Sequence, residues 1–335
     1  MKAVNHRWRK IFYVALSAVL FALCSSAEAQ QTGKVFRIGF LDSSTASGSV
    51  AVLDVFRQEL SKFGWIDGKN IIFEYRFAEQ KPERLPELAA DLVRLKLNLI
   101  VAVGRAPVFA AKNATTTIPI VMTGFPDPVA EGIVASLARP GGNITGFSNL
   151  ANGLTSKRLE ILKDTVPKLT RVGALRQAGG PAAGAPVFND LRAAAPILNL
   201  KLDEIESEAD AKGLANAFQT AKQKQVGALL IGGGSRFLAE RKRIVELAVK
   251  HRLPASYPQK EFVGEGGLMS YGADPADLYQ RAAVYVDKIL RGAHPADLSV
   301  QQATKFEFIV NLKAANQIGL TIPVRVLERA NQVIR

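Results

Sequence analysis

The sequence predicts an α/β protein made of two doubly wound parallel-sheet lobes. From residue 35 onward, short β-rich apolar runs alternate with longer segments that carry apolar side chains at three- and four-residue intervals. Successive predicted strands are separated by a helix, and such crossovers join parallel neighbours in a sheet. A second series of this kind starts after residue 149. Two series in one chain predict two sheets, and therefore two lobes with a cleft between them.

The first series ends at the turn 124–128. Its strands are short apolar runs, except that 71–77 has an apolar side chain at every second position. Its helices show helical apolar spacing or, for the third, small residues. The expected strands are 35–41, 71–77, 99–103 and 118–122, and the expected helices are 50–63, 85–95 and 106–114.

The second series follows the same rules, and a glycine at each end marks the strand 266–272. The expected strands are 171–175, 200–205, 228–231, 254–257, 266–272 and 306–310. The expected helices are 155–166, 186–198, 209–224, 237–251, 276–291 and one that begins at residue 311. The pattern alone predicts a single passage between the lobes, near residue 150.

Residues 1–29 have the features of a signal peptide. A basic start precedes an uncharged apolar run at 11–24, which is shorter than the ~20 residues that a membrane-spanning helix needs. Ala27-Glu28-Ala29 then predicts cleavage before Gln30. The alternative is a short uncleaved anchor; lipidation of Cys24 is disfavoured by the large Leu23 before it. We therefore expect an exported protein, located in the periplasm, without disulfides.

The net charge of +13 raises the question of nucleic-acid binding. The Lys and Arg residues are scattered over predicted helices without interleaved aromatic residues, and no helix-turn-helix or zinc-finger spacing occurs. We interpret the charge as a solvated basic surface and expect no nucleic-acid partner.

Known catalytic motifs do not occur. The glycine cluster Gly232-Gly233-Gly234 follows a predicted strand, but Phe237 stands where a dinucleotide fingerprint needs its third glycine. There is no phosphate loop, no Gly-x-Ser-x-Gly elbow and no zinc spacing, and His251 and His294 fall in different segments. We expect no enzyme activity, no catalytic residues, no cofactor and no metal; an enzyme with an unrecognised site is the weaker alternative.

Several segments carry a resemblance to a known family. They are RQEL with GW at 57–65, GKNI at 68–71, EYR at 74–76, AKNATTTIPIV at 111–121, LARPGGNITG at 137–146, GLMSYG at 267–272 and KFE at 305–307. With these segments in order, the chain from about residue 35 to its end resembles the tryptophan/tyrosine-type family of ABC-transporter substrate-binding proteins.

The resemblance implies a type I periplasmic-binding-protein fold, in which a three-strand hinge joins the lobes. The chain would cross near residues 148, 272 and 299, so that one lobe is 33–148 plus 273–298 and the other is 149–272 plus 299–335.

The function implied is that of a monomeric receptor that closes around a small polar or zwitterionic ligand, with an aromatic amino acid as the leading candidate. The receptor delivers the ligand to an ABC permease and its ATPase, and it meets the membrane only through that permease. The same fold also serves as a ligand sensor for a membrane kinase or chemoreceptor, and the sequence does not separate the two roles.

Candidate ligand-binding residues in the first lobe follow predicted strands, where an open α/β sheet binds its ligands. Ser43 and Ser44 offer hydroxyl and N–H groups to a ligand carboxylate at the start of a helix; the alternative is a helix N-cap. Asp127 stands between two prolines and is the candidate partner of a ligand ammonium; the alternative is an Asx turn or N-cap. Arg105 either pairs with a ligand carboxylate or caps a surface, and members of the resembled family more often have a small residue there.

The remaining candidates lie at the first crossing and in the second lobe. Ser148 and Asn149 either donate to the ligand or serve the hinge and its turn. Gln177 is a weaker candidate after the strand 171–175. Tyr257 and Tyr271 end strands and either contact a ligand ring or hydroxyl or are ordinary half-buried aromatics.

Overall fold

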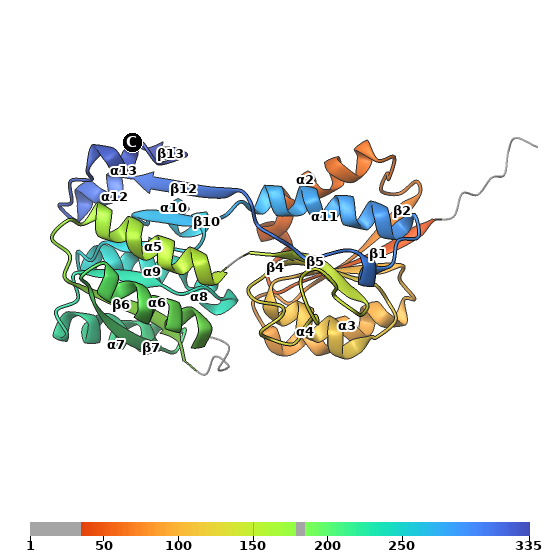
Figure 1. Ribbon diagram of the computed structural model, residues 1–335, viewed down its shortest axis with the longest axis horizontal. Helices are drawn as coiled ribbons and strands as arrows, with labels where there is room; N and C mark the ends of the chain where they lie inside the picture. Colours follow the sequence, from red (N-terminus) through yellow and green to blue (C-terminus); the bar gives the residue numbers. More distant parts are fainter. Residues whose placement is uncertain (1–34, 150, 179–184) are drawn as a thin grey trace, which may run out of the picture.

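The chain folds into two lobes that lie side by side and are joined by three connections (Figure 1). A computed structural model describes residues 35–149, 151–178 and 185–335. The expected signal peptide, 1–29, lies outside these residues. The α/β prediction with two mainly parallel sheets is confirmed.

The first lobe contains a six-stranded sheet in the order β11-β5-β4-β3-β1-β2, and every pair in it is parallel. Its strands are β1 (Phe36–Asp42), β2 (Ile71–Phe77), β3 (Leu99–Val103), β4 (Ile120–Phe125), β5 (Ile144–Ser148) and β11 (Gln301–Gln302). Its helices are α2 (Ala46–Lys62), η1 (Pro82–Arg84), α3 (Leu85–Arg94), α4 (Arg105–Ala114), α11 (Pro275–Leu290) and η3 (Pro295–Asp297).

Helices cover both faces of this sheet. On one face α2 and α11 pack together, and the ring of Tyr279 contacts both the buried Phe40 of β1 and Phe56 of α2. On the other face α3 and α4 bury Leu92 and Val108. Burial of each such side chain contributes about 1.5–3 kcal/mol, so each face has its own core.

The second lobe contains a seven-stranded sheet in the order β13-β12-β10-β9-β8-β6-β7. Its strands are β6 (Arg171–Gln177), β7 (Lys201–Ser207), β8 (Ala228–Ile231), β9 (Ala255–Tyr257), β10 (Met269–Ala273), β12 (Phe306–Asn311) and β13 (Gln332–Ile334). Its helices are α5 (Ala151–Thr165), α6 (Ala185–Ile197), α7 (Ala211–Gln223), α8 (Ser235–Ala239), α9 (Arg241–Lys250), α10 (Lys260–Gly264), α12 (Leu312–Gln317) and α13 (Val324–Leu327). Two cores again lie on opposite faces of the sheet.

The chain passes between the lobes three times. The first passage leads from β5 to α5 and the second from β10 to α11, which lies on the first sheet (Figure 1). The third leads from β11 to β12. We expected it near residue 299, but β11 pairs with β5 in the first sheet, so the passage lies between residues 302 and 306. Because the chain re-enters the second lobe from the first, β12 runs antiparallel to β10.

Three differences from the predicted elements have local causes. Helix α2 begins at Ala46 rather than at residue 50, because the Thr45 hydroxyl accepts a hydrogen bond from the Gly48 N–H and caps the helix earlier. The expected helix 237–251 is divided at Glu240 into α8 and α9. The elements α10, α13, β11 and β13 are too short to produce a periodic pattern.

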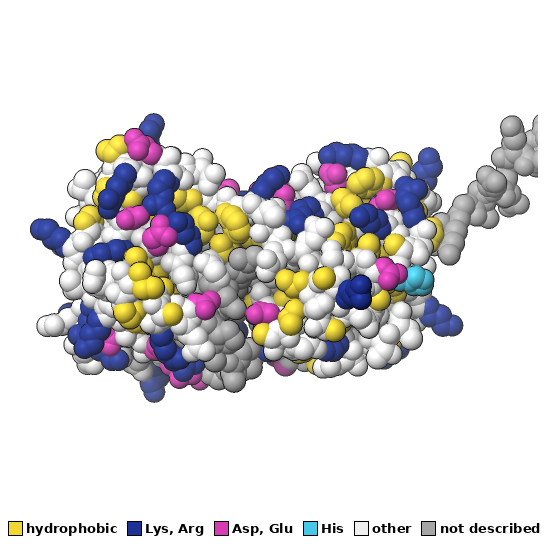
Figure 2. Space-filling model, in the orientation of Figure 1, with side chains coloured by type: hydrophobic (Ala, Val, Ile, Leu, Met, Phe, Trp, Pro, Cys, Tyr) yellow, Lys and Arg dark blue, Asp and Glu magenta, His cyan; other side chains and the backbone are white. Residues whose placement is uncertain are grey.

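Basic side chains are spread over both lobes on the face shown in Figure 2. Many of them pair with acids, as in Arg171 with Asp203 and Arg37 with Glu74. Among residues 35–149, 151–178 and 185–335, no helix has the length and apolar character needed to cross a membrane.

Candidate functional site

The carboxyl ends of the parallel strands in each sheet point toward the other lobe. Strand β5 ends at Ser148 and leads directly into the second lobe, and β10 ends at Ala273 and leads directly into the first. Because their parallel neighbours end on the same side, the loops after β1, β3 and β4 face those after β6, β8 and β9. We call these two sides the inner edges of the lobes. Polar residues on them are the candidates for ligand binding.

A buried carboxylate organises the first inner edge. Asp42 accepts a hydrogen bond from the Ser44 N–H at 2.9 Å and another from the Ser49 hydroxyl at 2.9 Å. The Ser44 and Ser49 hydroxyls lie 2.7 Å apart. Burial raises the pKa of Asp42, and the serine hydrogen bonds oppose that rise. The predicted residues Ser43 and Ser44 therefore form a fixed loop, in which Ser43 is buried.

This loop leads into the N-terminus of α2. Thr45 caps the helix, so the N-cap alternative considered for Ser43 and Ser44 is wrong. The first turn of α2 carries no acidic residue that would occupy its positive end. The loop and the helix start thus combine hydroxyls and a helix N-terminus, which suits an anionic group.

Arg105 is occupied within the first lobe. Its Nε donates to Glu131, and its guanidinium lies 4.8 Å from the centre of the Phe109 ring. It lines a surface depression with Leu85 and Phe109. Burial raises the pKa of Glu131, the hydrogen bond from Arg105 opposes this, and the charge of Asp127 adds to it. Glu131 balances the charge of Arg105 in this structure, and the pairing of Arg105 with a ligand carboxylate stays a prediction.

Asp127 follows β4 on the same inner edge. Its Oδ1 accepts a hydrogen bond from the Ala130 N–H at 3.0 Å, which is the Asx turn weighed as the alternative. A carboxylate offers about four acceptor positions, so the turn leaves it able to accept further hydrogen bonds. The turn also fixes the direction of the carboxylate.

The first crossing brings two further predicted residues to this edge. The Ser148 hydroxyl is buried and donates to the Pro126 carbonyl at 3.0 Å, which is the hinge role. The Asn149 N–H donates to the Phe125 carbonyl at 3.0 Å. The Asn149 Oδ1 is buried and has no hydrogen-bond partner among the described residues. Of the two, Asn149 has the polar atom that a ligand N–H would satisfy.

Gln80 is a residue on this edge that the sequence analysis missed. Its N–H donates to the Ser43 carbonyl at 2.8 Å, and its Oε1 is buried without a partner among the described residues. Its backbone adopts φ 62°, a left-handed conformation that side chains rarely occupy. A single sequence has no signal for this conformation, because Gln is not a residue that favours it.

The three residues predicted for the second inner edge have different surroundings. Gln177 ends β6, and its Oε1 lies 3.3 Å from the position that a Cβ on Gly234 would take. Tyr271 is half-buried and stacks on Phe306 with ring centres 6.0 Å apart. The ring of Tyr257 is only 1% exposed, and burial raises the pKa of its hydroxyl.

The prediction that Tyr257 contacts a ligand is therefore wrong, and Tyr257 is a core residue. Its ring stacks on Phe262 at 4.9 Å inside the second lobe. A strand of three residues directs it into the core face, and its position at the strand end did not reveal which face that was.

Arg158, on α5, is the other residue that sequence reasoning missed. It is 5% exposed, and it donates to the Thr155 hydroxyl at 2.9 Å and to the Ile231 carbonyl at 3.4 Å. A signal was present: Leu154, Arg158 and Leu162 are spaced by four residues, so the arginine interrupts the apolar face of the helix.

The donors on the inner edges do not form a metal site. In the part of the chain that the structure describes, no group of three or more His, Cys, Asp or Glu side chains is arranged to hold a metal ion. The arrangement offers hydrogen bonds and charges of both signs, which suits the binding of a small polar molecule.

Known proteins share this architecture. A solved structure of a conserved domain protein from Vibrio cholerae superposes with a TM-score of 0.82 at 26% identity and covers 90% of this chain and 100% of that one. The structure of an ABC domain from Streptococcus pneumoniae in complex with L-Trp gives a TM-score of 0.80 at 23% identity, with the same coverage. This second likeness shows the fold alone.

Sequence comparison agrees with the fold. The tyrosine-binding protein of Clostridioides difficile (strain R20291) is 26% identical over 256 residues, which are 76% of this chain and 73% of that protein. The family described as ABC transporter substrate binding protein matches residues 46–334. Since this match spans most of the chain, the protein belongs to the family of ABC transporter substrate-binding proteins.

Proposed function

We propose that the protein is the extracytoplasmic receptor of an ABC importer and that it binds a zwitterionic ligand between its two inner edges. The observation that carries this proposal is that two edges of opposite lobes, each with hydrogen-bonded polar side chains, face one another across three chain crossings. Closure about these crossings would enclose the ligand. An aromatic amino acid is the leading candidate, since one relative is a tyrosine-binding protein and a structure of the same fold holds L-Trp.

The first lobe supplies the main recognition groups in this proposal. The loop of Ser43 and Ser44 and the start of α2 receive the ligand carboxylate. Asp127 receives the ammonium group, together with the amide oxygen of Asn149. From the second lobe, Tyr271 offers a half-exposed ring, and Gln177 an amide. Export through a signal peptide cleaved before Gln30, and delivery as a monomer to a permease and its ATPase, complete the proposal.

The experiment is a thermal-shift screen of the protein recovered from the periplasm after expression of the full chain. A ligand that binds only the native state at a hundred times its Kd stabilises it by about 2.7 kcal/mol, which moves the melting curve measurably. We expect a selective shift with L-tyrosine or L-tryptophan. If neither these nor other amino acids shift the curve, the amino-acid assignment is wrong. N-terminal sequencing of the same sample checks the cleavage site.

Asp127→Asn tests the ammonium site in the same assay. The asparagine keeps an oxygen for the Ala130 N–H but removes the charge, so the melting midpoint should hold while amino-acid affinity falls about 10-fold or more. Asp91→Asn on the surface of α3 is the control and should change neither. Equal affinity in Asp127→Asn and wild type would remove Asp127 from the site.

A further inference from the structure

Arg158 is a buried cation directed toward the inner edge of the second lobe. Helical side chains lean toward the N-terminus of their helix, and the N-terminus of α5 lies at the hinge. The hydrogen bond from Arg158 to Thr155, one turn closer to that end, confirms this direction. Its second contact, the Ile231 carbonyl, is the last residue of β8 on the same edge.

No acid balances this charge among the described residues. The Arg158 Nε is buried and finds no hydrogen-bond partner in the part of the chain that the structure describes, and neither of the other two contacts is a carboxylate. Burial lowers the pKa of Arg158 to about 10, so the guanidinium is still protonated at neutral pH. A buried charge that is neither paired nor fully hydrogen-bonded is costly, and proteins retain one mainly where function requires it.

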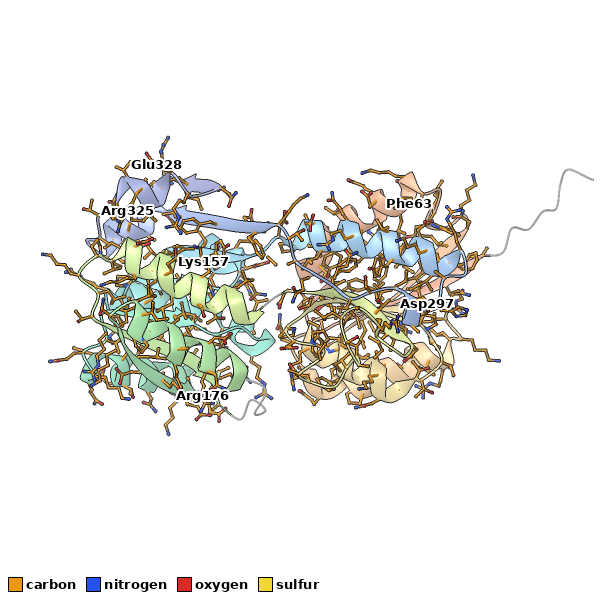
Figure 3. All side chains as sticks on the ribbon, in the orientation of Figure 1. Phe63, Lys157, Arg176, Asp297, Arg325 and Glu328 are labelled. Carbon is orange, nitrogen blue, oxygen red and sulfur yellow. The ribbon has the colours of Figure 1, made fainter. Side chains whose placement is uncertain are left out.

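Two other basic residues of the second lobe, Arg171 and Lys157, are paired with acids. Arg171, at the opposite end of β6, donates to Asp203 at 2.7 Å. Lys157, the residue before Arg158 on α5 (Figure 3), pairs with Glu160 at 2.7 Å on the surface. Arg158 is thus distinguished from Lys157 and from Arg171 by both burial and the lack of an acid.

Three glycines follow the end of β8, which lies beside Arg158. A Cβ on Gly232 would approach the Leu175 carbonyl to 2.9 Å, so that residue must be small. Gly233 and Gly234 are exposed, and no heavy atom lies within 4 Å of a Cβ built on Gly233. Packing therefore does not require a glycine at position 233. A glycine there leaves the edge without a side chain, and the Gln177 amide lies beside the next residue, Gly234.

We propose that Arg158, with the Gly233–Gly234 edge and Gln177, forms an anion subsite that binds a carboxylate of the ligand. A guanidinium matches a carboxylate with two parallel hydrogen bonds, and the unpartnered Nε belongs to that fork. Because Gly233 and Gly234 have no side chains, a carboxylate can reach the guanidinium past this edge. The inference deepens the proposed function, on which it rests: the ligand class is a carboxylate, and the group that the Ser43–Ser44 loop receives in the first lobe is also contacted by Arg158 from the second.

The test compares Arg158→Met with Arg171→Met. Methionine fills the space of the arginine stem without a charge. If Arg158 serves the ligand, the melting midpoint of ligand-free Arg158→Met should equal or exceed that of wild type, because an unbalanced buried charge has been removed. Arg171→Met should instead melt slightly lower, because Asp203 loses a partner. A midpoint more than about 5 °C lower in Arg158→Met would assign it a structural role and overturn the proposal.

Binding is then measured by thermal shift and calorimetry with L-tyrosine, L-tryptophan, phenylpyruvate and succinate, and with L-tyrosinamide, L-tryptophanamide and succinamide as probes without the carboxylate. We expect wild type and Arg171→Met to bind at least one acid better than its amide. Arg158→Met should lose about 10-fold or more of that affinity, and Arg158→Lys a smaller part, since it keeps the charge without the fork.

Two results of the binding measurements would also overturn the proposal: equal affinity of Arg158→Met and wild type for the acid, or no stabilisation of wild type by any acid of the panel. The proposed amino-acid function fails separately. If only phenylpyruvate or succinate binds, and binding depends on Arg158, the amino-acid assignment is wrong and the anion subsite stands. If L-tyrosine binds both proteins equally, the receptor function stands and the subsite is wrong.

Discussion

The two inner edges balance their buried charges in opposite ways. On the first, Asp42 has hydrogen-bond donors from its own loop and Arg105 has Glu131. On the second, Arg158 is buried without an acid among the described residues. The charges of Asp42 and Arg105 on the first edge are thus balanced before any ligand arrives, whereas the second edge has a charge that only an added anion balances.

This difference gives the proposed closure a physical driving force. A ligand shifts a conformational equilibrium only through interactions that differ between the two states. A carboxylate docked first on the preformed loop of the first lobe would gain contact with Arg158 only when the lobes close. The free energy recovered by balancing that charge would then favour the closed form with ligand over the closed form without it.

The largest effect on stability is expected from substituting a glycine in the first lobe, and a matched glycine in the second lobe should show almost none. In the first sheet, Gly146 has φ +132°, and a Cβ there would lie 2.1 Å from the Met122 carbonyl oxygen. Gly146→Ala should therefore lower the free energy of unfolding by about 3–5 kcal/mol. In the chain that the proposed cleavage before Gln30 would leave, Trp65 is the remaining tryptophan, so its fluorescence during urea unfolding reports on the first lobe.

Gly233→Ala is the matched variant in the second lobe. Nothing lies near its Cβ position, so stability should change by less than about 0.5 kcal/mol. Carboxylate affinity should fall if the open edge serves the ligand. Similar unfolding curves for the two glycine variants would contradict the difference between the crowded Gly146 and the open Gly233.

A smaller effect is expected from Asp42→Ala. The Ser44 N–H and the Ser49 hydroxyl would lose their acceptor in a buried position, which costs about 2–4 kcal/mol. Asp54→Ala on the exposed surface of α2 should cost less than about 0.5 kcal/mol. Urea unfolding followed by Trp65 fluorescence measures both. A loss in Asp42→Ala no larger than in Asp54→Ala would show that the first edge is not organised by Asp42.

The smallest effect is a contrast in pH dependence. Burial raises the pKa of Asp42, so its folded form holds a proton more tightly than the unfolded chain does. Its contribution to stability therefore declines as pH rises above about 4. Burial alone would raise the pKa of Asp203 as well, but hydrogen bonds from Arg171 and Lys224 outweigh it and lower the pKa. The stability that Asp203 contributes is present above about pH 4 and is lost as pH falls below it.

Asp42→Asn and Asp203→Asn separate these two contributions. Between pH 3 and 6, on the acid side of neutrality, the unfolding free energy of Asp203→Asn should rise less with pH than that of wild type, and that of Asp42→Asn should rise more. Urea titrations followed by circular dichroism provide the curves. Parallel curves for all three proteins would mean that neither carboxylate has a shifted pKa.

The sequence predicted most of the first lobe correctly because its pattern is local. The strands 71–77 and 99–103 coincide with β2 and β3, since alternating or continuous apolar residues define a strand without reference to the rest of the fold. The start of α2 was missed because Ser47-Gly48-Ser49 has no apolar spacing, and only the cap from Thr45 shows that these residues are helical.

The candidate site was predicted unevenly for the same reason. Ser44, Asp127 and Asn149 reach the first inner edge because a residue that follows a parallel strand must lie there. The position of a residue after a strand does not determine which groups its side chain contacts, however. Arg105 pairs with Glu131, which is 26 residues away, and Tyr257 turns into the core.

By itself, the sequence determined the two-lobed α/β class, the positions of most elements and the residues available at strand ends. These follow from periodicity, which acts over a few neighbouring residues. Only the tertiary structure decided where the third crossing lies, which charges find a partner and which do not. Those outcomes depend on contacts between residues far apart in the chain: Arg158 and Ile231 are 73 positions apart, and their proximity arises only when α5 packs on the second sheet.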